Sequence, residues 1–316
     1  MESKLKKDEG NLTTLVEFIL FGFSGVPDLQ GFLFGVFLII YMIILIGNSL
    51  IIILTKVDTS LQTPMYFFLG NFSFLEICYV SVTVPKLLAD LCRQNRKISF
   101  LACAIQMYFF LVFGATECFL LTAMAYDRYV AICNPLLYPL IMNTRLCIQL
   151  AAGCWIIGVP VHIGFTYLIF SLPFCGPNQL DHFFCDIPPI LKLACGNTSM
   201  IETLIYVIAV LVVTVPFMLI LGSYVKIIST IQKLPSATGR AKAFSTCSSH
   251  LVVVALFFGS GIITYMRPKA THSLGMEKFL SLFYTIVTPM FNPVIYCLRN
   301  KDVTVALSKL LSKWIV

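Results

Sequence analysis

Two carboxylates stand inside long apolar stretches of this 316-residue chain. Glu76 lies in the stretch from 64 to about 92, and Glu117 lies in the stretch from about 98 to 133. If these stretches cross a membrane, both carboxylates are costly to bury, and an ionisable residue at that depth marks a functional site by default. Two such groups need a cation or a shared proton to coexist, so the pair predicts one of these two arrangements.

The stretch that contains Glu117 ends in a charged pair, Asp127-Arg128. A set of residues in this stretch recurs at three- and four-residue steps and therefore shares one face of a helix. Its members are Phe110, Gly114, Glu117, Leu121, Met124 and Arg128. Cys103 and Arg128 would lie about 37 Å apart along this helix, and therefore at its two ends. The charged pair is either a switch that exchanges partners between two states or a pair of charges at the lipid headgroups.

Four of the twelve cysteines stand apart from the apolar stretches or at their ends: Cys103, Cys175, Cys185 and Cys195. Four cysteines allow three disulfide pairings, and their spacing alone does not choose among them. A metal site is disfavoured because the spacing is wrong for paired zinc ligands and His182 is the one histidine nearby. The remaining cysteines are typical of small apolar fillers.

The composition defines the class of protein that must position these residues. Hydrophobic residues make up 58% of the chain, charged residues make up 12%, and the mean hydropathy is +0.89. A soluble domain carries roughly 25% charged residues, so a soluble globule is excluded. Aromatic residues at 13% exclude a disordered chain. The net charge of +7 is spread without a basic run, so no nucleic-acid partner is expected.

A bilayer-spanning helix needs about 20 mostly apolar residues, and the chain offers seven such stretches. They cover residues 31–54, 64–92, 98–133, 146–171, 200–231, 243–266 and 279–298. Residues 301–316 alternate apolar and basic positions with helical spacing, which predicts an amphipathic helix on the membrane surface. The expected fold is an all-α membrane protein, a seven-transmembrane helix bundle with a C-terminal surface helix.

The orientation rests mainly on one glycosylation sequon. Basic residues are divided almost evenly between the two sets of loops, so the positive-inside rule hardly discriminates. The sequon Asn11-Leu12-Thr13 can be glycosylated only on the lumenal side of the membrane, which becomes the extracellular side. It therefore favours an extracellular N-terminus with Asn11 glycosylated. We therefore expect an extracellular N-terminus at 1–28, a membrane domain at 29–298 and a cytoplasmic tail at 299–316. The first residues lack an apolar signal sequence, so the first span is expected to act as the signal.

A set of short motifs resembles one receptor family. The run Met124-Ala-Tyr-Asp-Arg-Tyr-Val-Ala-Ile-Cys133 is similar to the signature of the olfactory branch of rhodopsin-like G-protein-coupled receptors. Further family motifs follow in the right order on the right spans: Gly47-Asn48, Pro64 to Phe68, Ser223-Tyr224, Lys242 to His250, and Pro289 to Tyr296. The resemblance covers nearly the whole chain and points to the tetrapod-type class of odorant receptors.

The resemblance implies a switch at the inner ends of the helices. Its members are the latch residues, the tyrosines that swing inward and the hinge of the seventh span: Asp127, Arg128, Tyr129, Tyr224, Tyr296, Asn292 and Pro293. It further implies a receptor and not an enzyme, with a stimulatory olfactory G protein as partner and cyclic AMP as output.

The resemblance also implies covalent and ionic features. Cys103 pairs with Cys185, and Cys175 pairs with Cys195. Glu76 and Glu117 match the acids that frame a sodium pocket, which makes Na⁺ the one cofactor to expect, with a protonated acid pair as the alternative. Glu76 departs from the aspartate that is usual there, and its longer side chain would shift the pocket or favour protonation.

The implied ligand cavity lies in the outer half of the bundle, between spans three, five, six and seven. Its wall would comprise Met107, Phe110, Leu111, Gly114, Ala115, Ile205, Ile208, Ala209, Val212, Phe258, Ile262, Tyr265 and Thr285. Tyr265 and Thr285 are the polar handles, and a charged ligand would lack a partner. Phe258 departs from the tyrosine that is usual in the family. We expect small, neutral, mostly apolar volatile ligands.

The expected location is the plasma membrane, with several spans and with lipids as further partners. The main rival is a transporter or channel, because intramembrane acids suit proton relays. The two halves of the chain show no repeat that such a protein often has. A membrane enzyme is the third reading, but the sequence lacks the metalloprotease, hydrolase and phosphate-loop motifs.

Overall fold

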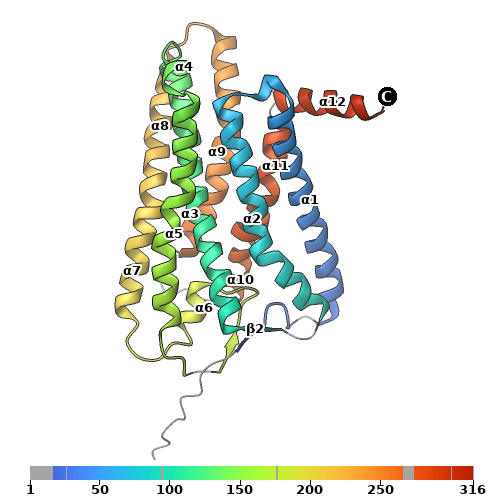
Figure 1. The fold of residues 1–316 in the computed structure, drawn as a ribbon, viewed down its shortest axis with the longest axis vertical. Helices are drawn as coiled ribbons and strands as arrows, with labels where there is room; N and C mark the ends of the chain where they lie inside the picture. The colour runs from blue at the N-terminus through green and yellow to red at the C-terminus, as the bar shows by residue number, and fades with distance from the viewer. Residues whose placement is uncertain are drawn as a thin grey trace, which may run out of the picture.

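The computed structural model describes residues 17–25, 27–93, 96–175, 177–265, 274–299 and 301–315. Within them, seven helical spans are long and apolar enough to cross a membrane. Figure 1 shows them side by side as one bundle. In chain order the helices that build them are α1 (Gln30–Val57), α2 (Pro64–Cys92), α3 (Phe100–Cys133), α5 (Thr144–Phe170), α7 (Ser199–Ala209) with α8 (Val215–Gln232), α9 (Ala237–Tyr265), and α10 (Leu274–Leu282) with α11 (Thr288–Arg299). The expected all-α, seven-span membrane fold is thus confirmed.

Apolar side chains cover the outside of the bundle as well as its core. Ile39, Ile156 and Val225 are each more than 60% exposed, although all three are large and aliphatic. In water such a surface would be unfavourable, whereas hydrocarbon is a good solvent for it. A helix pairs most of its backbone polar groups within itself, which is what a bilayer requires of a spanning segment.

Two spans contain a turn of π-helix in their outer halves. η3 (Val210–Thr214) joins α7 to α8, and η5 (Phe283–Val287) joins α10 to α11. A π-turn inserts an extra residue and re-aims the side chains beside it, and such turns are frequent at functional sites. Apolar periodicity gave no sign of either turn. The sequence also placed the start of the sixth span at 243, whereas α9 begins at Ala237, because the polar residues before 243 extend the helix beyond its apolar part.

The first and seventh spans approach closely at Gly47. A β-carbon placed on Gly47 would lie 2.9 Å from the β-carbon of Pro293. The missing side chain therefore lets α1 pack directly against the proline of α11. Asn48, the next residue, is buried and donates a hydrogen bond from Nδ2 to Ile44 O at 3.0 Å.

Replacing Gly47 by valine is expected to destabilise the fold by about 1–3 kcal/mol, because the added atoms overlap the Pro293 ring. The melting temperature of the purified protein in detergent measures this change. Gly35→Val is the matched control, since Gly35 lies on the same helix and its β-carbon would have no neighbour within 4 Å. Equal melting temperatures for the two variants would contradict the close contact.

A small sheet closes one end of the bundle. β1 (Glu17–Leu20) pairs antiparallel with β2 (Lys97–Ser99) and parallel with β3 (Gln179–Leu180). Phe18 and Leu20 face inward and are 0% and 1% exposed, as the two-residue period of a strand requires. Lys97 Nζ lies 2.5 Å from Glu17 Oε1 across the first pair. This sheet was not predictable from the sequence, because its strands are too short for a two-residue period to be visible.

Two disulfides hold the same end of the molecule. Cys103 bonds to Cys185 and Cys175 bonds to Cys195, with Cα–Cα distances of 5.5 and 5.7 Å. These are the two pairings that the family resemblance implied. The first bond ties the start of α3 to the long segment before α7. That segment also carries α6 (Ile187–Leu191).

The surface helix α12 (Lys301–Ile315) lies at the opposite end, runs roughly perpendicular to the spans and projects sideways past α1 (Figure 1). Val303 and Ala306 are buried against the bundle, and Tyr66 donates a hydrogen bond from its hydroxyl to Asp302 Oδ2 at 3.0 Å. The helix is therefore fixed by a contact to α2 as well as by its apolar face.

Candidate functional site

An apolar cavity of about 160 Å³ lies between the third, fourth, fifth and sixth spans and η5. Its wall is formed by Tyr79, Phe110, Leu111, Gly114, Ala115, Cys118, His162, Phe165, Ile187, Ile205, Ile208, Ala209, Val212, Val213, Phe257, Phe258, Gly261, Ile262 and Tyr284. The third span contributes five of these residues and the sixth contributes four. Cavities of this kind are the usual place for a small ligand.

Most of the residues that the sequence suggested for the ligand wall border this cavity. They are Phe110, Leu111, Gly114, Ala115, Ile205, Ile208, Ala209, Val212, Phe258 and Ile262. Met107 does not: it is fully buried in the core cluster beneath the sheet, one turn too far out. Thr285 does not either, because its hydroxyl donates to Ser281 O at 2.6 Å and is fully buried. The side chain of Tyr265 lies outside the described residues.

The remaining wall residues were not suggested by the sequence. Tyr79 and Phe165 come from helices that the expected cavity did not touch, and Ile187 comes from the loop helix α6. Tyr284 rather than Thr285 borders the cavity, since the π-turn η5 changes which residue faces inward. His162 was visible as a lone polar residue in an apolar stretch, but nothing in its spacing tied it to a cavity.

The described wall carries no Lys, Arg, Asp or Glu side chain. Aromatic rings line much of it: Phe110 packs against Tyr79 with ring centroids 5.2 Å apart, and Phe258 packs against Phe217 at the same distance. A ligand with a net charge would lose its hydration without gaining a partner here, at a cost of several kcal/mol. The wall therefore selects for uncharged molecules.

A buried polar network covers the cavity beside Tyr284. The Tyr284 hydroxyl lies 2.9 Å from both Asp186 Oδ2 and Ser281 Oγ. His182 Nε2 lies 3.0 Å from the same Ser281 oxygen. His182 and Asp186 flank the disulfide at Cys185, so the network links the loop to the seventh span. One side of Tyr284 thus faces the ligand cavity and the other side holds the loop.

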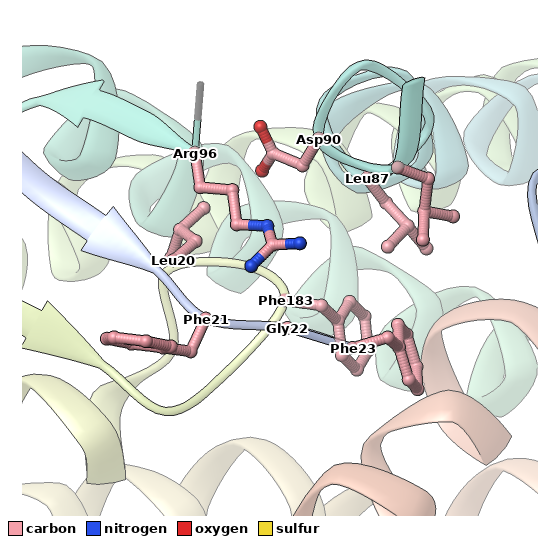
Figure 2. Close-up of a pocket in the computed structure, with 9 residues that line it drawn as sticks. Leu20, Phe21, Gly22, Phe23, Leu87, Asp90, Arg96 and Phe183 are labelled. Carbon is pink, nitrogen blue, oxygen red and sulfur yellow. The ribbon is translucent and has the colours of Figure 1, made fainter. Parts of the chain in front are cut away.

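A second, smaller cavity lies under the sheet, outside the first (Figure 2). Figure 2 shows the Arg96 guanidinium and the Asp90 carboxylate across it from one another, above the stacked rings of Phe23 and Phe183. Its volume of about 10 Å³ suits one water molecule and no larger ligand. Asp90 also forms an ion pair with Lys86. The larger cavity is therefore the candidate ligand site.

The two intramembrane acids lie together below the ligand cavity. Glu76 and Glu117 are each 1% exposed and within hydrogen-bonding reach of one another. Asn292 donates a hydrogen bond from Nδ2 to Glu76 Oε1. Oxygen atoms of all three side chains, Glu76 Oε2, Glu117 Oε1 and Asn292 Oδ1, are buried without a hydrogen-bond partner. Orphaned oxygens of this kind need an ion, a proton or water to satisfy them.

A hydrogen-bonded chain joins three spans near their inner ends. His250 Nε2 lies 3.1 Å from Leu121 O, and His250 Nδ1 lies 2.8 Å from the Tyr224 hydroxyl. A backbone carbonyl can only accept, so Nε2 carries the proton and the neutral ring accepts at Nδ1 from Tyr224. The sequence assigned no role to His250 beyond its motif. The structure makes it the link that holds Tyr224 of α8 against α9 and α3.

Asp127 and Arg128 are both buried, but no ion pair within 4.0 Å joins these two described side chains. Asp127 Oδ1 instead accepts a hydrogen bond from the Tyr138 hydroxyl at 2.8 Å. Burial raises the pKa of Tyr138, which keeps its hydroxyl protonated as the donor. The expected pairing of Arg128 with Asp127 is thus absent in this state, because a residue of α4 (Tyr138–Ile141) satisfies the acid.

Two of the other predicted switch residues, Tyr224 and Tyr296, lie near Arg128. Its charge acts on Tyr224, His250 and Tyr296. Tyr296 is buried against Phe72 with its hydroxyl unpaired. Tyr129 is partly buried and packs at the edge of the same core. Pro293 lies inside α11. Asn11 lies outside the described residues.

Seven membrane-type helices around an apolar cavity, with polar contacts at the inner ends of the third, fifth and sixth spans, define a seven-helix membrane receptor. A family model described as "Olfactory receptor" matches residues 37–314. The human protein "Olfactory receptor 10AG1" is 61% identical over 298 residues, covering 94% of this chain and 99% of the relative.

Two further relatives agree with this assignment. "Olfactory receptor 10C1" of Homo sapiens is 54% identical over 96% of this chain and 97% of its own length. "Olfactory receptor 6B9" of Mus musculus is 50% identical over 95% of each chain. The chain belongs to the olfactory receptor family of rhodopsin-like G-protein-coupled receptors. It is a multi-pass membrane protein and a signalling receptor, not an enzyme.

Proposed function

We propose that the protein resides in the plasma membrane, binds small, neutral, mostly apolar volatile molecules and activates a stimulatory, olfactory-type G protein to raise cyclic AMP. The observation that carries the ligand class is the cavity of about 160 Å³, whose described wall is apolar and uncharged. The family membership supports an odorant as ligand and a G protein as partner in general terms.

The mechanism is a ligand-shifted equilibrium between two helix packings. An odorant that binds one packing better draws the population towards it, by no more than its difference in affinity for the two. In the structure the Tyr224–His250 bond holds α8 against α9. Outward movement of the inner end of α9 breaks this bond and opens a cleft at Arg128. The C-terminal helix of the G protein occupies that cleft.

The N-terminus faces the extracellular side in this proposal, and Asn11 is glycosylated there. Both disulfides lie at the end of the bundle that carries β1, and disulfides persist in oxidising surroundings. The opposite end carries α12 and the Arg128 cleft, which therefore face the cytoplasm and the inner leaflet lipids.

A cyclic AMP assay in cells that express the receptor and the olfactory G protein tests the proposal. The panel contains neutral odorants, aliphatic amines and aliphatic acids, with surface expression measured for each sample. The neutral odorants are expected to raise cyclic AMP in these cells. A response confined to amines or acids would contradict the uncharged wall, and silence of a surface-expressed receptor towards a broad panel would contradict the ligand class.

We further propose that Glu76 and Glu117 hold one Na⁺ ion, with Asn292 and Ser73 beside them. All four side chains are buried, and each has an oxygen without a hydrogen-bond partner. The unpaired atoms of this group are all oxygens, which are the ligands that a hard cation prefers. The bound ion would neutralise one of the two acids and restrain α2, α3 and α11 relative to each other.

Sodium is expected to raise the melting temperature of the purified receptor by about 3 °C over N-methylglucamine at equal ionic strength, because a ligand of the folded state stabilises it. Glu117→Gln should abolish the difference while remaining folded. A wild-type receptor indifferent to sodium would instead indicate that the two acids share a proton.

A further inference from the structure

His162 places an imidazole ring on the mostly apolar wall of the ligand cavity. It lies in the second half of α5 and is 4% exposed. Its Nδ1 lies 2.7 Å from Gly158 O, one turn back along the same helix. That carbonyl can only accept, so Nδ1 carries a proton and donates.

The other ring nitrogen of His162 is uncommitted. Nε2 has no hydrogen-bond partner among the described residues, and no described acid forms an ion pair with the ring. A buried imidazolium without a counter-ion is costly, so the ring is neutral. A neutral ring protonated at Nδ1 has a lone pair at Nε2, which accepts a hydrogen bond and cannot donate one.

The position of this acceptor is fixed by packing. At Gly158 the third and fourth spans approach so closely that an added β-carbon would touch Ala115 at 3.5 Å and His162 Nδ1 at 3.7 Å. Ala115 is itself a wall residue. Because Nδ1 is turned back to its own helix, Nε2 points away from Gly158 O, and the ring that carries it lines the cavity.

The other polar groups of the described wall differ from His162. The Tyr284 hydroxyl is held by Asp186 and Ser281. The Cys118 thiol is a weak donor and a weak acceptor. Tyr79 also carries a hydroxyl, and its ring is stacked on Phe110. His162 is therefore the strong hydrogen-bond acceptor of the wall. A Tyr79→Phe variant serves as the comparison, because Tyr79 carries the other hydroxyl that a ligand could meet.

We propose that His162 makes the cavity selective for neutral odorants that carry a hydroxyl group, namely alcohols and phenols, whose O–H donates to Nε2. A ketone, ester or hydrocarbon of the same shape leaves the buried acceptor unsatisfied. The inference rests on the proposed odorant function and narrows its ligand class. One satisfied buried hydrogen bond corresponds to a preference of about tenfold in concentration.

Two series of equal skeleton serve as probes: borneol, camphor and bornane, and 1-octanol, octanal and octane. The melting temperature of the purified receptor reports binding directly, and cyclic AMP in cells reports activation. The wild type is expected to respond to the alcohol of a series at about one tenth of the concentration needed for its carbonyl or hydrocarbon analogue.

Three variants identify the residue responsible. His162→Leu should remove the preference for the alcohol while leaving the response to the hydrocarbon skeleton. His162→Gln, whose amide oxygen can accept, should keep part of the preference, which excludes a merely structural role for the ring. Tyr79→Phe should leave the preference intact.

The failures are distinguishable. Equal responses to alcohol and ketone in the wild type, or loss of the preference in Tyr79→Phe with none in His162→Leu, would overturn the role of His162 and leave the odorant function standing. No response to any probe in either assay would overturn the proposed neutral-odorant function and this inference with it.

Discussion

Gly114→Leu is expected to weaken the response to every odorant that activates the wild type. The odorant concentration needed for a half-maximal response should rise by about 100-fold or more. Gly114 lies on the cavity wall, and a β-carbon added there has no neighbour within 4 Å. The four added carbons would therefore extend into the space of about 160 Å³ that a ligand needs. A side chain that fills the cavity removes all contacts between the ligand and the wall, whereas the loss of one polar group removes a single interaction.

The matched control for this variant is Gly164→Leu. Gly164 also has open space at its β-carbon, but it lies on the outer face of α5 and its substitution adds an apolar side chain towards lipid. Both variants should reach the cell surface in similar amounts. An unchanged dose–response curve for Gly114→Leu would show that odorants bind elsewhere.

Arg128→Ala is expected to abolish odorant-driven cyclic AMP while leaving odorant binding measurable by thermal stabilisation. Arg128 is 7% exposed and its charge acts on Tyr224, His250 and Tyr296, the residues that the proposed movement rearranges. Removing the guanidinium removes the group that the G protein meets in the opened cleft. The ligand cavity lies in the other half of the bundle and is untouched.

Arg128→Lys separates charge from geometry, because lysine keeps the charge but lacks the planar fork of donors. It should retain only a small part of the signal. Arg145→Ala is the control for a lost positive charge at the same end, since Arg145 is exposed at the start of α5. Normal signalling by Arg128→Ala at equal surface expression would refute the role given to this residue.

The membrane architecture was predictable because the bilayer imposes a simple rule. Each span needs about 20 apolar residues, and this signal is strong enough to place α2 at its observed start, Pro64. The disulfide partners were not predictable from spacing; they followed from the motifs shared with a family. The family resemblance also implied ten of the residues that line the cavity.

The differences arise from local geometry that no periodicity reveals. The π-turn η5 presents Tyr284 in place of Thr285 to the cavity. Asp127 was expected to pair with Arg128, because adjacent opposite charges suggest an ion pair. In the structure Asp127 instead accepts a hydrogen bond from the neutral hydroxyl of Tyr138. The sequence assigned no role to His162, since a lone histidine in an apolar stretch gives no sign of what lies across from it.

The most direct test of this account is nucleotide exchange on a purified stimulatory G protein, measured with the purified receptor in lipid nanodiscs. Neutral odorants are expected to accelerate exchange with wild-type receptor, and neither Gly114→Leu nor Arg128→Ala should support the acceleration. Aliphatic amines and acids should have no effect. Exchange driven only by charged compounds, or odorant-driven exchange that survives both substitutions, would contradict the link from the apolar cavity to the Arg128 cleft.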